Sequence, residues 1–271
     1  MKRILILLAL MFCLSCTALK KSAQPTDFVD PFICTEGDHG HWHPSALVPF
    51  GLVKLGPDTW PSSLTGDGDF AHGGYNWADE HIRGFSHFRK GSSGGGSVRD
   101  RAGLLSIFPF IERTEDIDFK NTIIKINKKS QKAEPGYYEV KLANNIFAQL
   151  SASTHVGFHR YSFPARAVQK LYLNSRGALS AEQKNETELT GVLGSGASSR
   201  FFILHFDQPI KKISFFENGN IQNSSAVAGK GGVILDFGET NGKPLQIKVG
   251  VSLTSLERAR ENLNAEVPHW K

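Results

Sequence analysis

The sequence predicts an all-β protein: an antiparallel β-sandwich with one short helix near its C-terminal end. Two observations predict this class. From residue 104 onward, short segments of strand-forming composition follow one another, the clearest with strict alternation of apolar and polar residues. The sequences between them are turn-like and show no internal repeat. A chain of 271 residues is long enough for one large all-β domain or for two ordinary domains.

The first element in the chain is a secretory signal over residues 1–16. It has a basic start, an apolar run over 4–14, and small Ser15 directly before Cys16. The apolar run is shorter than the ~20 residues that a membrane helix needs. We therefore expect Cys16 to become the lipid-bearing first residue of a bacterial lipoprotein, although Cys13 stands where Leu is usual. The protein would be exported across the inner membrane and held in the periplasm or at the cell surface.

Cysteine usage and charge narrow the class further. Removal of the signal leaves Cys34 as a lone thiol, so the mature domain has no intrachain disulfide and depends on its core. The formal net charge is +5, without any long basic run. This pattern argues against a nucleic-acid partner. Contact with a membrane is expected through the lipid anchor only.

Residues 35–103 differ in composition and in hydrophobic pattern from the rest of the chain. They are rich in Gly, His, Trp and Asp and show little period-two alternation. A long irregular stretch in a compact domain is usually functional. Its aromatic rings interleave with polar residues, a mixture that binds sugars, and Trp60 and Trp77 are the best candidates for exposed platforms. The alternative is that most of these rings belong to the core.

Three histidines at alternate positions raise the possibility of a metal site. On a strand, His39, His41 and His43 would point to one face and could converge on zinc. Gly40 and Pro44 make a regular strand unfavourable, and no HExxH or paired CxxC motif accompanies the cluster. A zinc hydrolase therefore stays as the weakest of the functional hypotheses.

Two further motifs resemble functional sites without their usual context. The letters GSSGG fit GxSxG with Ser93 as nucleophile and His87 close by, but no buried strand and helix flank them, which favours a flexible glycine-rich loop. The letters GDGDF offer Asp67 and Asp69 as calcium ligands, but the next ligand and the glycine of a calcium loop are missing, which favours a polar turn.

The β segments beyond residue 104 predict the layers of the sandwich. The clearest is 245–251, in which apolar and polar residues alternate, so that one face is buried. The other expected strands are, in order, 121–126, 137–142, 146–152, 169–174, 200–206, 211–216 and 231–237.

The last predicted element is a helix. Thr254 is the expected N-cap, with Glu257 three residues later, and the helix should end before Pro268. Its apolar stripe consists of Leu256, Ala259 and Leu263. This stripe needs a surface to bury against, and the sequence shows no partner for it. We therefore interpret residues 254–271 as the start of an interdomain segment.

At this point the ordered motifs resemble a known family. The string DFVDPFICTEGDHGHWHPSALVPFGLVKLGPDT resembles the opening of glycoside hydrolase family 92, the bacterial exo-acting α-mannosidases. Further segments match in the same order: GGYNWADEHIRGFSH, AEPGYYEVKL, LSASTHVGFHRYSFP and VGVSLTSLERARENLNAEVPHW. The resemblance covers nearly all of the mature chain.

The resemblance implies a domain organisation and assigns catalysis to a domain other than the sandwich. A linker at 17–26 would precede a supersandwich-like β-sandwich at 27–253, followed in full-length members by an (α/α)6 catalytic domain that this chain lacks. Members are calcium-dependent inverting enzymes whose general-acid Glu and general-base carboxylate lie in the helical domain. Inversion needs two carboxyls roughly 6.5 to 9.5 Å apart. We therefore expect no cofactor, calcium included, in this chain and no hydrolysis of mannosides by the chain alone.

The resemblance also implies partners and site residues. The partners would be a mannose-containing glycan, as in N-glycan degradation, and the missing catalytic domain. No catalytic or metal-binding residue is expected here. The expected substrate-binding residues come from GDHGHWHP, GPDTW, GGYNW and GFSH, and are His39, His41, Asp58, Trp60, Tyr75, Trp77, Ser86 and His87.

The chain departs from the family pattern at Cys34 and over residues 89–92. Cys34 stands where Gly is usual, and Arg89 and Lys90 begin the run that replaces His, Leu, Ser and Gly after GFSH. Two added cations beside the pocket would favour a phosphorylated or otherwise anionic glycan, unless they are solvated loop charges. We expect Trp60 and His87 on the loop face. The alternative function is a stand-alone lipoprotein sandwich that binds glycans without cleaving them.

Overall fold

The structure is a computed structural model, and it describes residues 23–36, 42–59, 73–89, 103–175, 177–217, 220–222, 226–229, 231–239 and 241–270. Several residues singled out in the sequence lie outside these ranges: Cys16, His39, His41, Trp60, Asp67, Asp69, Lys90 and Ser93. Among the described residues, no helix has the length and apolar character that a membrane span requires.

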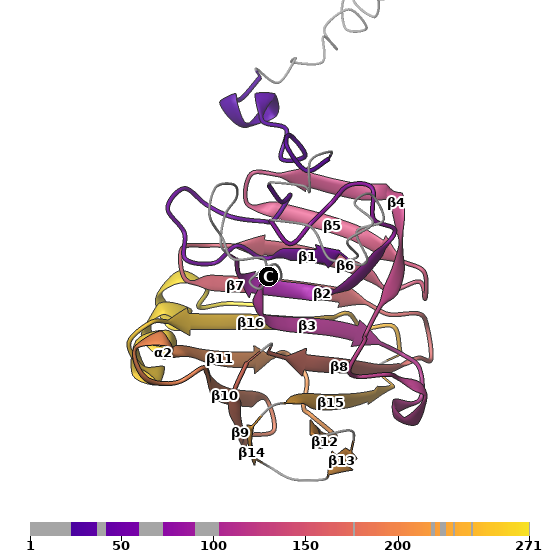
Figure 1. Cartoon of the computed structure of the whole chain (residues 1–271), viewed down its shortest axis with the longest axis vertical. Helices are drawn as coiled ribbons and strands as arrows, with labels where there is room; N and C mark the ends of the chain where they lie inside the picture. Colours follow the sequence, from indigo (N-terminus) through magenta and orange to yellow (C-terminus); the bar gives the residue numbers. More distant parts are fainter. Residues whose placement is uncertain are drawn as a thin grey trace, which may run out of the picture.

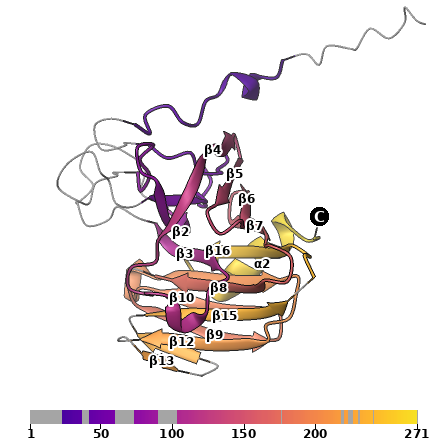
Figure 2. The same ribbon diagram turned by 90° about the vertical axis from the view of Figure 1, so that its right-hand side faces the viewer.

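The described residues form sixteen strands in one continuous antiparallel sheet that folds over into two facing layers (Figures 1 and 2). This arrangement confirms the predicted all-β sandwich. The first layer has the order β13-β12-β15-β8-β3-β2, with β1 paired to β2. Its strands are β1 (Gly56–Thr59), β2 (His81–Phe88), β3 (Leu104–Phe110), β8 (Val168–Asn174), β12 (Lys212–Glu217), β13 (Asn220–Gln222) and β15 (Gly231–Glu239).

The second layer has the order β4-β5-β6-β7-β16-β11-β10-β9-β14, and β4 joins it to β2 of the first layer. Its strands are β4 (Ile124–Glu134), β5 (Tyr137–Leu142), β6 (Phe147–Ala152), β7 (Val156–Ser162), β9 (Leu179–Asn185), β10 (Glu188–Leu193), β11 (Arg200–Phe206), β14 (Ala226–Gly229) and β16 (Leu245–Ser252). Short 3-10 turns occur at η1 (Pro25–Phe28), η2 (Thr114–Asp116) and η3 (Gly196–Ser198). The segment before β1 lies at the end of the sandwich that carries β4 and β5.

The predicted strands all have counterparts, and the boundaries of two of them, β5 and β11, agree with the prediction. The prediction was less complete elsewhere. The expected strand at 121–126 begins three residues later, at Ile124, and continues to Glu134. Beyond residue 103, strands β3, β7, β9, β10, β13 and β14 were not predicted. In β9 and β10, charged residues and a glycine interrupt the alternation.

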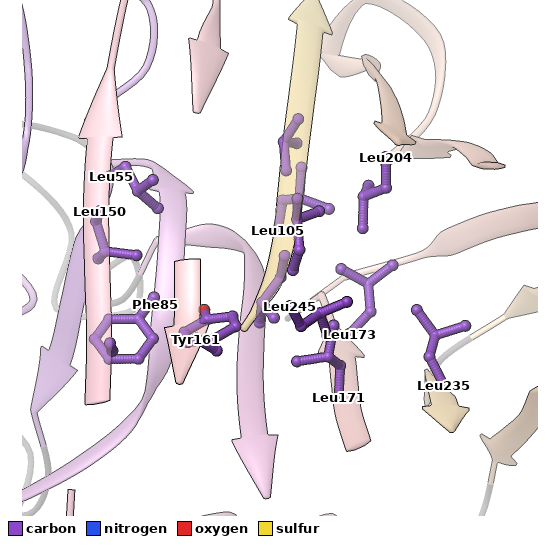
Figure 3. Close-up of a cluster of buried hydrophobic side chains, with 14 of the residues drawn as sticks. Leu55, Phe85, Leu105, Leu150, Tyr161, Leu171, Leu173, Leu204, Leu235 and Leu245 are labelled. Carbon is purple, nitrogen blue, oxygen red and sulfur yellow. The ribbon is translucent and has the colours of Figure 1, made fainter. Parts of the chain in front are cut away.

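The hydrophobic core lies between the two layers. In β16, Leu245, Ile247 and Val249 are fully buried, as the alternation predicted. They belong to one cluster with Leu171 and Leu173 of β8 in the facing layer (Figure 3). Both layers therefore bury their inward positions against each other, which is the driving force for this fold.

The C-terminal helix α2 (Leu256–Glu266) differs from the prediction in two respects. Its N-cap is Ser255, whose Oγ accepts a hydrogen bond from the Arg258 amide (3.1 Å), rather than Thr254. The helix also has a partner. Ala259 and Leu263 are 0% and 3% exposed, because they pack on the outer face of the second layer over Gly250 of β16. Both differences, the N-cap at Ser255 instead of Thr254 and the packing of the helix on β16, depend on tertiary structure.

Gly250 makes this close packing possible. A Cβ at this position would lie 2.6 Å from the Ala259 carbonyl oxygen and 2.8 Å from the Leu263 Cβ. Beyond the helix, Trp270 continues over the same face, and the Lys248 ammonium lies 4.3 Å from the centre of its ring. The outer face of β16 is therefore covered along much of its length.

We predict that Gly250→Val lowers the free energy of unfolding by about 1–3 kcal/mol, because the added side chain overpacks the helix contact. Valine is a good strand former, so strand propensity would not explain the loss. Urea unfolding would measure it. The control is Gly177→Ala, where a Cβ meets nothing within 4 Å. Equal stabilities for the two variants would contradict the proposed role of Gly250.

Candidate functional site

A polar pocket of about 300 Å³ lies on the outer face of the first layer. Its lining consists of Asp58, Arg83, Gly103, Ser106, Lys120, Thr122 and Asn174. The strand register explains its polarity. Ser86 pairs with Ser106, and Ser106 pairs with Asn174, which forms a polar row across three strands. The neighbouring row, Phe85, Ile107 and Leu173, faces the core.

The segment between β3 and β4 forms one side of this pocket. Phe119 is 3% exposed, and its ring lies 4.6 Å from that of Tyr172 on the outer face of β8. The aromatic contact holds the following residues, Lys120 and Thr122, at the pocket. Thr122 also donates a hydrogen bond to the Arg83 carbonyl oxygen (3.3 Å).

A buried ion pair forms the centre of the site. Arg89 Nη2 lies 3.0 Å from Asp58 Oδ1, and the two side chains are 1% and 3% exposed. The same Oδ1 accepts hydrogen bonds from Ser86 Oγ and from the Gly103 amide, each at 3.1 Å. Three donors on one oxygen compensate for removing the carboxylate from water.

Arg89 also connects segments that are distant in sequence. It donates to the carbonyl oxygens of Gly56 and Gly73, the latter at 3.2 Å. The segments 42–59 and 73–89 and the start of β3 are therefore fixed around one guanidinium.

Glycine is required where these segments approach one another. A Cβ on Gly103 would lie 2.0 Å from Ser86 Oγ, and one on Gly56 would lie 2.1 Å from Ser45 Oγ. Both distances are shorter than side-chain contacts allow, so the close approach depends on the absence of a side chain.

The geometry corrects the interpretation of Arg89. The sequence suggested a cation available to an anionic glycan, but Arg89 is buried and its charge is neutralised by Asp58. Lys90, the second proposed cation, lies outside the described residues. The anionic-glycan interpretation therefore loses the support of Arg89, because Arg89 holds the wall of the pocket together.

The loop after Gly73 carries Tyr75 and Trp77. The Asn76 amide donates to Thr59 Oγ1 (2.8 Å), and the Trp77 amide donates to the Thr35 carbonyl oxygen (2.8 Å). Tyr75 is 1% exposed, and its hydroxyl donates to Gln131 Oε1 (2.9 Å). Tyr75 thus contributes to the packing of the loop and does not present its ring at the surface.

Trp77 is half-buried, and two neighbours contact its ring. Phe32 packs against it edge to face at 5.1 Å, and the Lys128 ammonium lies 5.1 Å from the ring centre. Lys128 also donates to the Trp77 carbonyl oxygen. Of the two tryptophans proposed as sugar platforms, Trp77 is thus partly accessible, and Trp60 lies outside the described residues.

Cys34, which stands where glycine is usual, has a φ of 63°. This left-handed region favours glycine because a side chain crowds the backbone there. A glycine, which the family resemblance implies at this position, would adopt this φ without strain. Cys34 itself is exposed.

His87 lies on the opposite face of β2 and not on the loop face. It is fully buried, and it crosses the core to the facing layer. Its Nε2 is 2.9 Å from His159 Nε2 in β7, and His159 Nδ1 is 2.8 Å from the Tyr161 hydroxyl. His87 Nδ1 is 2.7 Å from the Leu105 carbonyl oxygen. The expectation of an exposed His87 was wrong because alternation turns this residue inward.

The partners determine the direction of every hydrogen bond in this chain of rings. A carbonyl oxygen only accepts, so His87 Nδ1 donates to Leu105 and His87 Nε2 is an acceptor. His159 Nε2 must then donate to His87, and His159 Nδ1 accepts from Tyr161. Both imidazoles are neutral. Burial lowers the pKa of His87 to about 4, and burial together with the nearby His87 lowers the pKa of His159.

Of the three histidines considered for zinc, the structure describes His43. Its ring is 1% exposed and stacks on Trp42, with centroids 5.1 Å apart. Burial, then the charges of Arg89 and Lys54, lower the pKa of His43. Neither ring nitrogen has a hydrogen-bond partner among the described residues. Within that part of the chain, no group of three His, Cys, Asp or Glu side chains is arranged to hold a metal ion.

The structure therefore brings together some of the predicted site residues. Asp58 lines the pocket, Ser86 supports it, and Tyr75 and Trp77 lie on the loop anchored beside it. His87 belongs to the core. Sequence reasoning missed Arg83, Ser106, Lys120 and Asn174 as site residues. Arg83 lies within the family-like segment GGYNWADEHIRGFSH, and the other three lie outside the quoted motifs. The lining offers hydroxyl, amide, ammonium and guanidinium groups, which suit a polyhydroxylated ligand. Within the described part of the chain, Asp58 is its one carboxylate.

The chain is similar to known proteins along most of its length. A model of the glycosyl hydrolase family 92 N-terminal domain matches residues 28–252. A curated relative from Arthroderma benhamiae, described as an uncharacterized secreted glycosidase, is 24% identical, and the match covers 97% of this chain and 37% of the relative.

Two solved structures have the same fold. A family GH92 glycosyl hydrolase, ccman5, is 25% identical with a TM-score of 0.75 over 91% of this chain and 35% of that one. A family GH92 inverting mannosidase from Bacteroides thetaiotaomicron VPI-5482 is 22% identical with a TM-score of 0.77 over 93% of this chain and 34% of that one. The chain thus spans about a third of the length of these relatives.

We predict that Asp58→Asn lowers the free energy of unfolding by about 3–5 kcal/mol, because it leaves Arg89 charged and buried without a counter-ion. Chemical denaturation would measure the loss. Combining Asp58→Asn with Arg89→Met should cost less than the sum of the single changes. The control is Glu80→Gln, which breaks the exposed pair with Lys125 and should leave stability unchanged. Strict additivity of the Asp58 and Arg89 changes would contradict their coupling.

We also predict that stability falls in mild acid because of His87 and His159. Their folded-state pKa values lie below the unfolded value of about 6.5, so their contribution is fully present above pH ~6.5. It is lost as the pH falls from there towards about 4, at up to ~1.4 kcal/mol per pH unit for each histidine.

Urea unfolding between pH 8 and 5 would test this dependence. His159→Gln should flatten the decline below pH 6.5, and exposed His269→Gln serves as the control. If the free energy of unfolding of His159→Gln falls with pH as steeply as that of the unchanged protein, the His87–His159 hydrogen bond is not responsible.

Proposed function

The chain belongs to glycosyl hydrolase family 92, of which it carries the N-terminal domain, and on this basis we propose that it forms a sugar-contacting wall of an α-mannosidase. The match confirms the family resemblance that the sequence motifs suggested. In the proposed enzyme, this domain contacts a mannose-containing glycan, and the rest of the glycosidase supplies the hydrolytic groups. Because the chain spans about a third of its relatives, the activity belongs to a longer assembly.

The observation that carries this proposal is the origin of the pocket. Three of the family-like segments are joined at or beside it: GPDTW supplies Asp58 of the lining, GFSH supplies Ser86, which donates to Asp58, and GGYNW is anchored to Thr59 next to Asp58. Motifs separated in sequence that assemble one polar concave surface suit ligand binding better than core packing alone. Ser106 and Asn174 offer further groups for hydroxyl recognition.

The pocket binds and orients in this proposal, and it does not perform acid–base chemistry. Inverting hydrolysis requires two carboxyl groups on opposite sides of the scissile bond, roughly 6.5 to 9.5 Å apart. Among the described residues that line the pocket, Asp58 is the one carboxylate, and its Oδ1 already receives three donors. The role left for this chain is to fix the sugar by hydrogen bonds and to limit its access to water.

We propose calcium dependence and inversion for the complete enzyme only. Among the described residues, no cluster of three acidic or imidazole side chains is arranged for a metal, so the part of the chain that we describe does not fit the ion. Following the family resemblance, we propose that the calcium ligands belong to the part of the glycosidase beyond this domain.

We further propose that the protein is exported and anchored through Cys16. The Arthroderma relative is described as secreted, and residues 1–16 have the composition of a signal with Cys16 at its end. Cys16 lies outside the described residues, so this step rests on the sequence. Metabolic labelling with a fatty acid, lost in Cys16→Ser, would test it.

We predict that α-mannobiose binds the isolated chain with millimolar affinity and that Asn174→Ala weakens binding about fivefold. Loss of one hydrogen bond is worth ~1 kcal/mol, which corresponds to this factor. Titration calorimetry would measure it, with unchanged melting temperature as the folding check. Asn220→Ala, in the exposed strand β13, is the matched control.

The outcome also separates this function from its alternative. No heat and no thermal shift with millimolar mannose or α-mannobiose would remove a stand-alone glycan-binding lipoprotein. If Asn174→Ala then leaves the KM of a complete enzyme unchanged, the pocket is not part of the sugar site.

A further inference from the structure

Phe50 has two features that oppose the stability of this domain on its own. Its side chain is fully exposed, at 104%. It also has a φ of 61°, in a turn closed by the Gly51 amide and the Val48 carbonyl oxygen (3.0 Å). A positive φ at this turn position suits glycine or asparagine and disfavours a bulky residue. A strained and solvated aromatic residue indicates a role outside the domain.

An open pocket of about 410 Å³ lies near this turn. Its lining consists of Ser151, Ala152, Ser153, Val156, Phe158, Glu266, Val267, Pro268 and His269. Most of the wall is apolar, and it combines strands β6 and β7 with the end of α2. Its volume is in the range of sites that receive a ligand or a large side chain.

Glu266 holds the two halves of this pocket together. It accepts hydrogen bonds from Ser153 Oγ (2.5 Å), from the His155 amide (2.9 Å) and from His155 Nδ1 (2.6 Å). These bonds lower the pKa of Glu266, although burial acts in the opposite direction. The carboxylate therefore fastens the end of α2 to the β6–β7 turn, so the pocket is formed before any partner arrives.

The Phe50 turn and the pocket share one structural support. The Leu52 and Val53 amides both donate to the Thr154 carbonyl oxygen, at 2.7 and 3.3 Å. Thr154 lies in the turn whose neighbours Ser153 and His155 bind Glu266. We define the Phe50 surface as residues 48–51, the turn 153–155 and the segment 266–269. It presents an aromatic anchor beside an apolar pocket, the combination found at the centres of protein interfaces.

We propose that the Phe50 surface docks against the part of the glycosidase that follows this domain in its relatives, with Phe50 as the anchor and an apolar side chain of the partner in the pocket. The order of segments along the chain indicates which polypeptide would cover this surface. The family match ends at residue 252, and α2 comes next. The end of α2 lines the pocket, so a polypeptide continuing from it starts at the rim of the surface.

The lengths of the relatives support the same occupant. The present chain covers 34–37% of them, so about two-thirds of a relative remains available to cover the surface. The docking inference rests on the proposed function in one respect, because both require the remaining two-thirds of the glycosidase. It differs in location, because the sugar pocket lies on the first layer and the Phe50 surface on the second.

Hydroxyl-radical footprinting would test the docking. The chain of residues 1–271 is compared with the longest natural polypeptide that contains it, without sugar. We expect the oxidation rate of Phe50 to fall at least about fivefold in the longer polypeptide, as for a fully desolvated anchor. Ile221 in β13, which is 44% exposed, should react equally in both. Equal oxidation of Phe50 in the two chains, or a natural polypeptide with nothing beyond residue 271, overturns the proposal.

A pair of variants separates an anchor from a structural residue. In the 1–271 chain, Phe50→Ser should leave the melting temperature unchanged or raise it. In the longer polypeptide it should split one unfolding transition into two, and Ile221→Ser should not. A lower melting temperature of Phe50→Ser in the 1–271 chain, or a single transition in the longer one, overturns the proposal.

The result also separates this inference from the proposed function. A protected Phe50 without mannoside binding supports docking and removes the sugar contact. An unprotected Phe50 with mannoside binding overturns docking and retains the sugar contact.

Discussion

The buried pair of Asp58 and Arg89 is the constraint on which the site depends. Two charges removed from water are tolerated only when each is well paired and hydrogen-bonded. Here the carboxylate oxygen receives three donors, and the guanidinium also reaches two backbone carbonyl oxygens. Satisfying this pair brings three segments of the chain together: 42–59, 73–89 and the residue before β3. The pocket wall is a consequence of that requirement, and so is the need for glycine at positions 56 and 103.

The same constraint limits the chemistry of the domain. Asp58 Oδ1 is occupied by Arg89 and two further donors, and Arg89 is not available to an anionic ligand. In the proposed function, the pocket recognises hydroxyl groups, and the bond-breaking step is assigned to the rest of the glycosidase. Binding and hydrolysis are divided between two parts of one enzyme in this view. That division agrees with a chain that matches a family N-terminal domain and a third of its relatives.

Strand β2 links this pocket to the core. Its Ser86 faces the pocket, and the next residue, His87, crosses to His159 and Tyr161 in the facing layer. The bridge is a chain of neutral groups with defined donors and acceptors, so it fixes the relative position of the layers as apolar packing alone would not. The second layer carries its own specialised surface, where Glu266 joins α2 to the β6–β7 turn near Phe50.

The sequence by itself determined the fold class, more than half of the strands after residue 104 and the family-like segments that carry Asp58, Tyr75 and Ser86. Period-two alternation and turn residues are local signals, and the family-like motifs are contiguous strings, so both can be read without coordinates. Only the tertiary structure decided the roles of individual side chains. Arg89 resembled a free loop cation, His87 a loop residue and α2 a helix without a partner. Each was decided by a partner distant in sequence, namely Asp58, His159 and Gly250. Burial and pairing depend on register and on layer contacts, which no local pattern specifies.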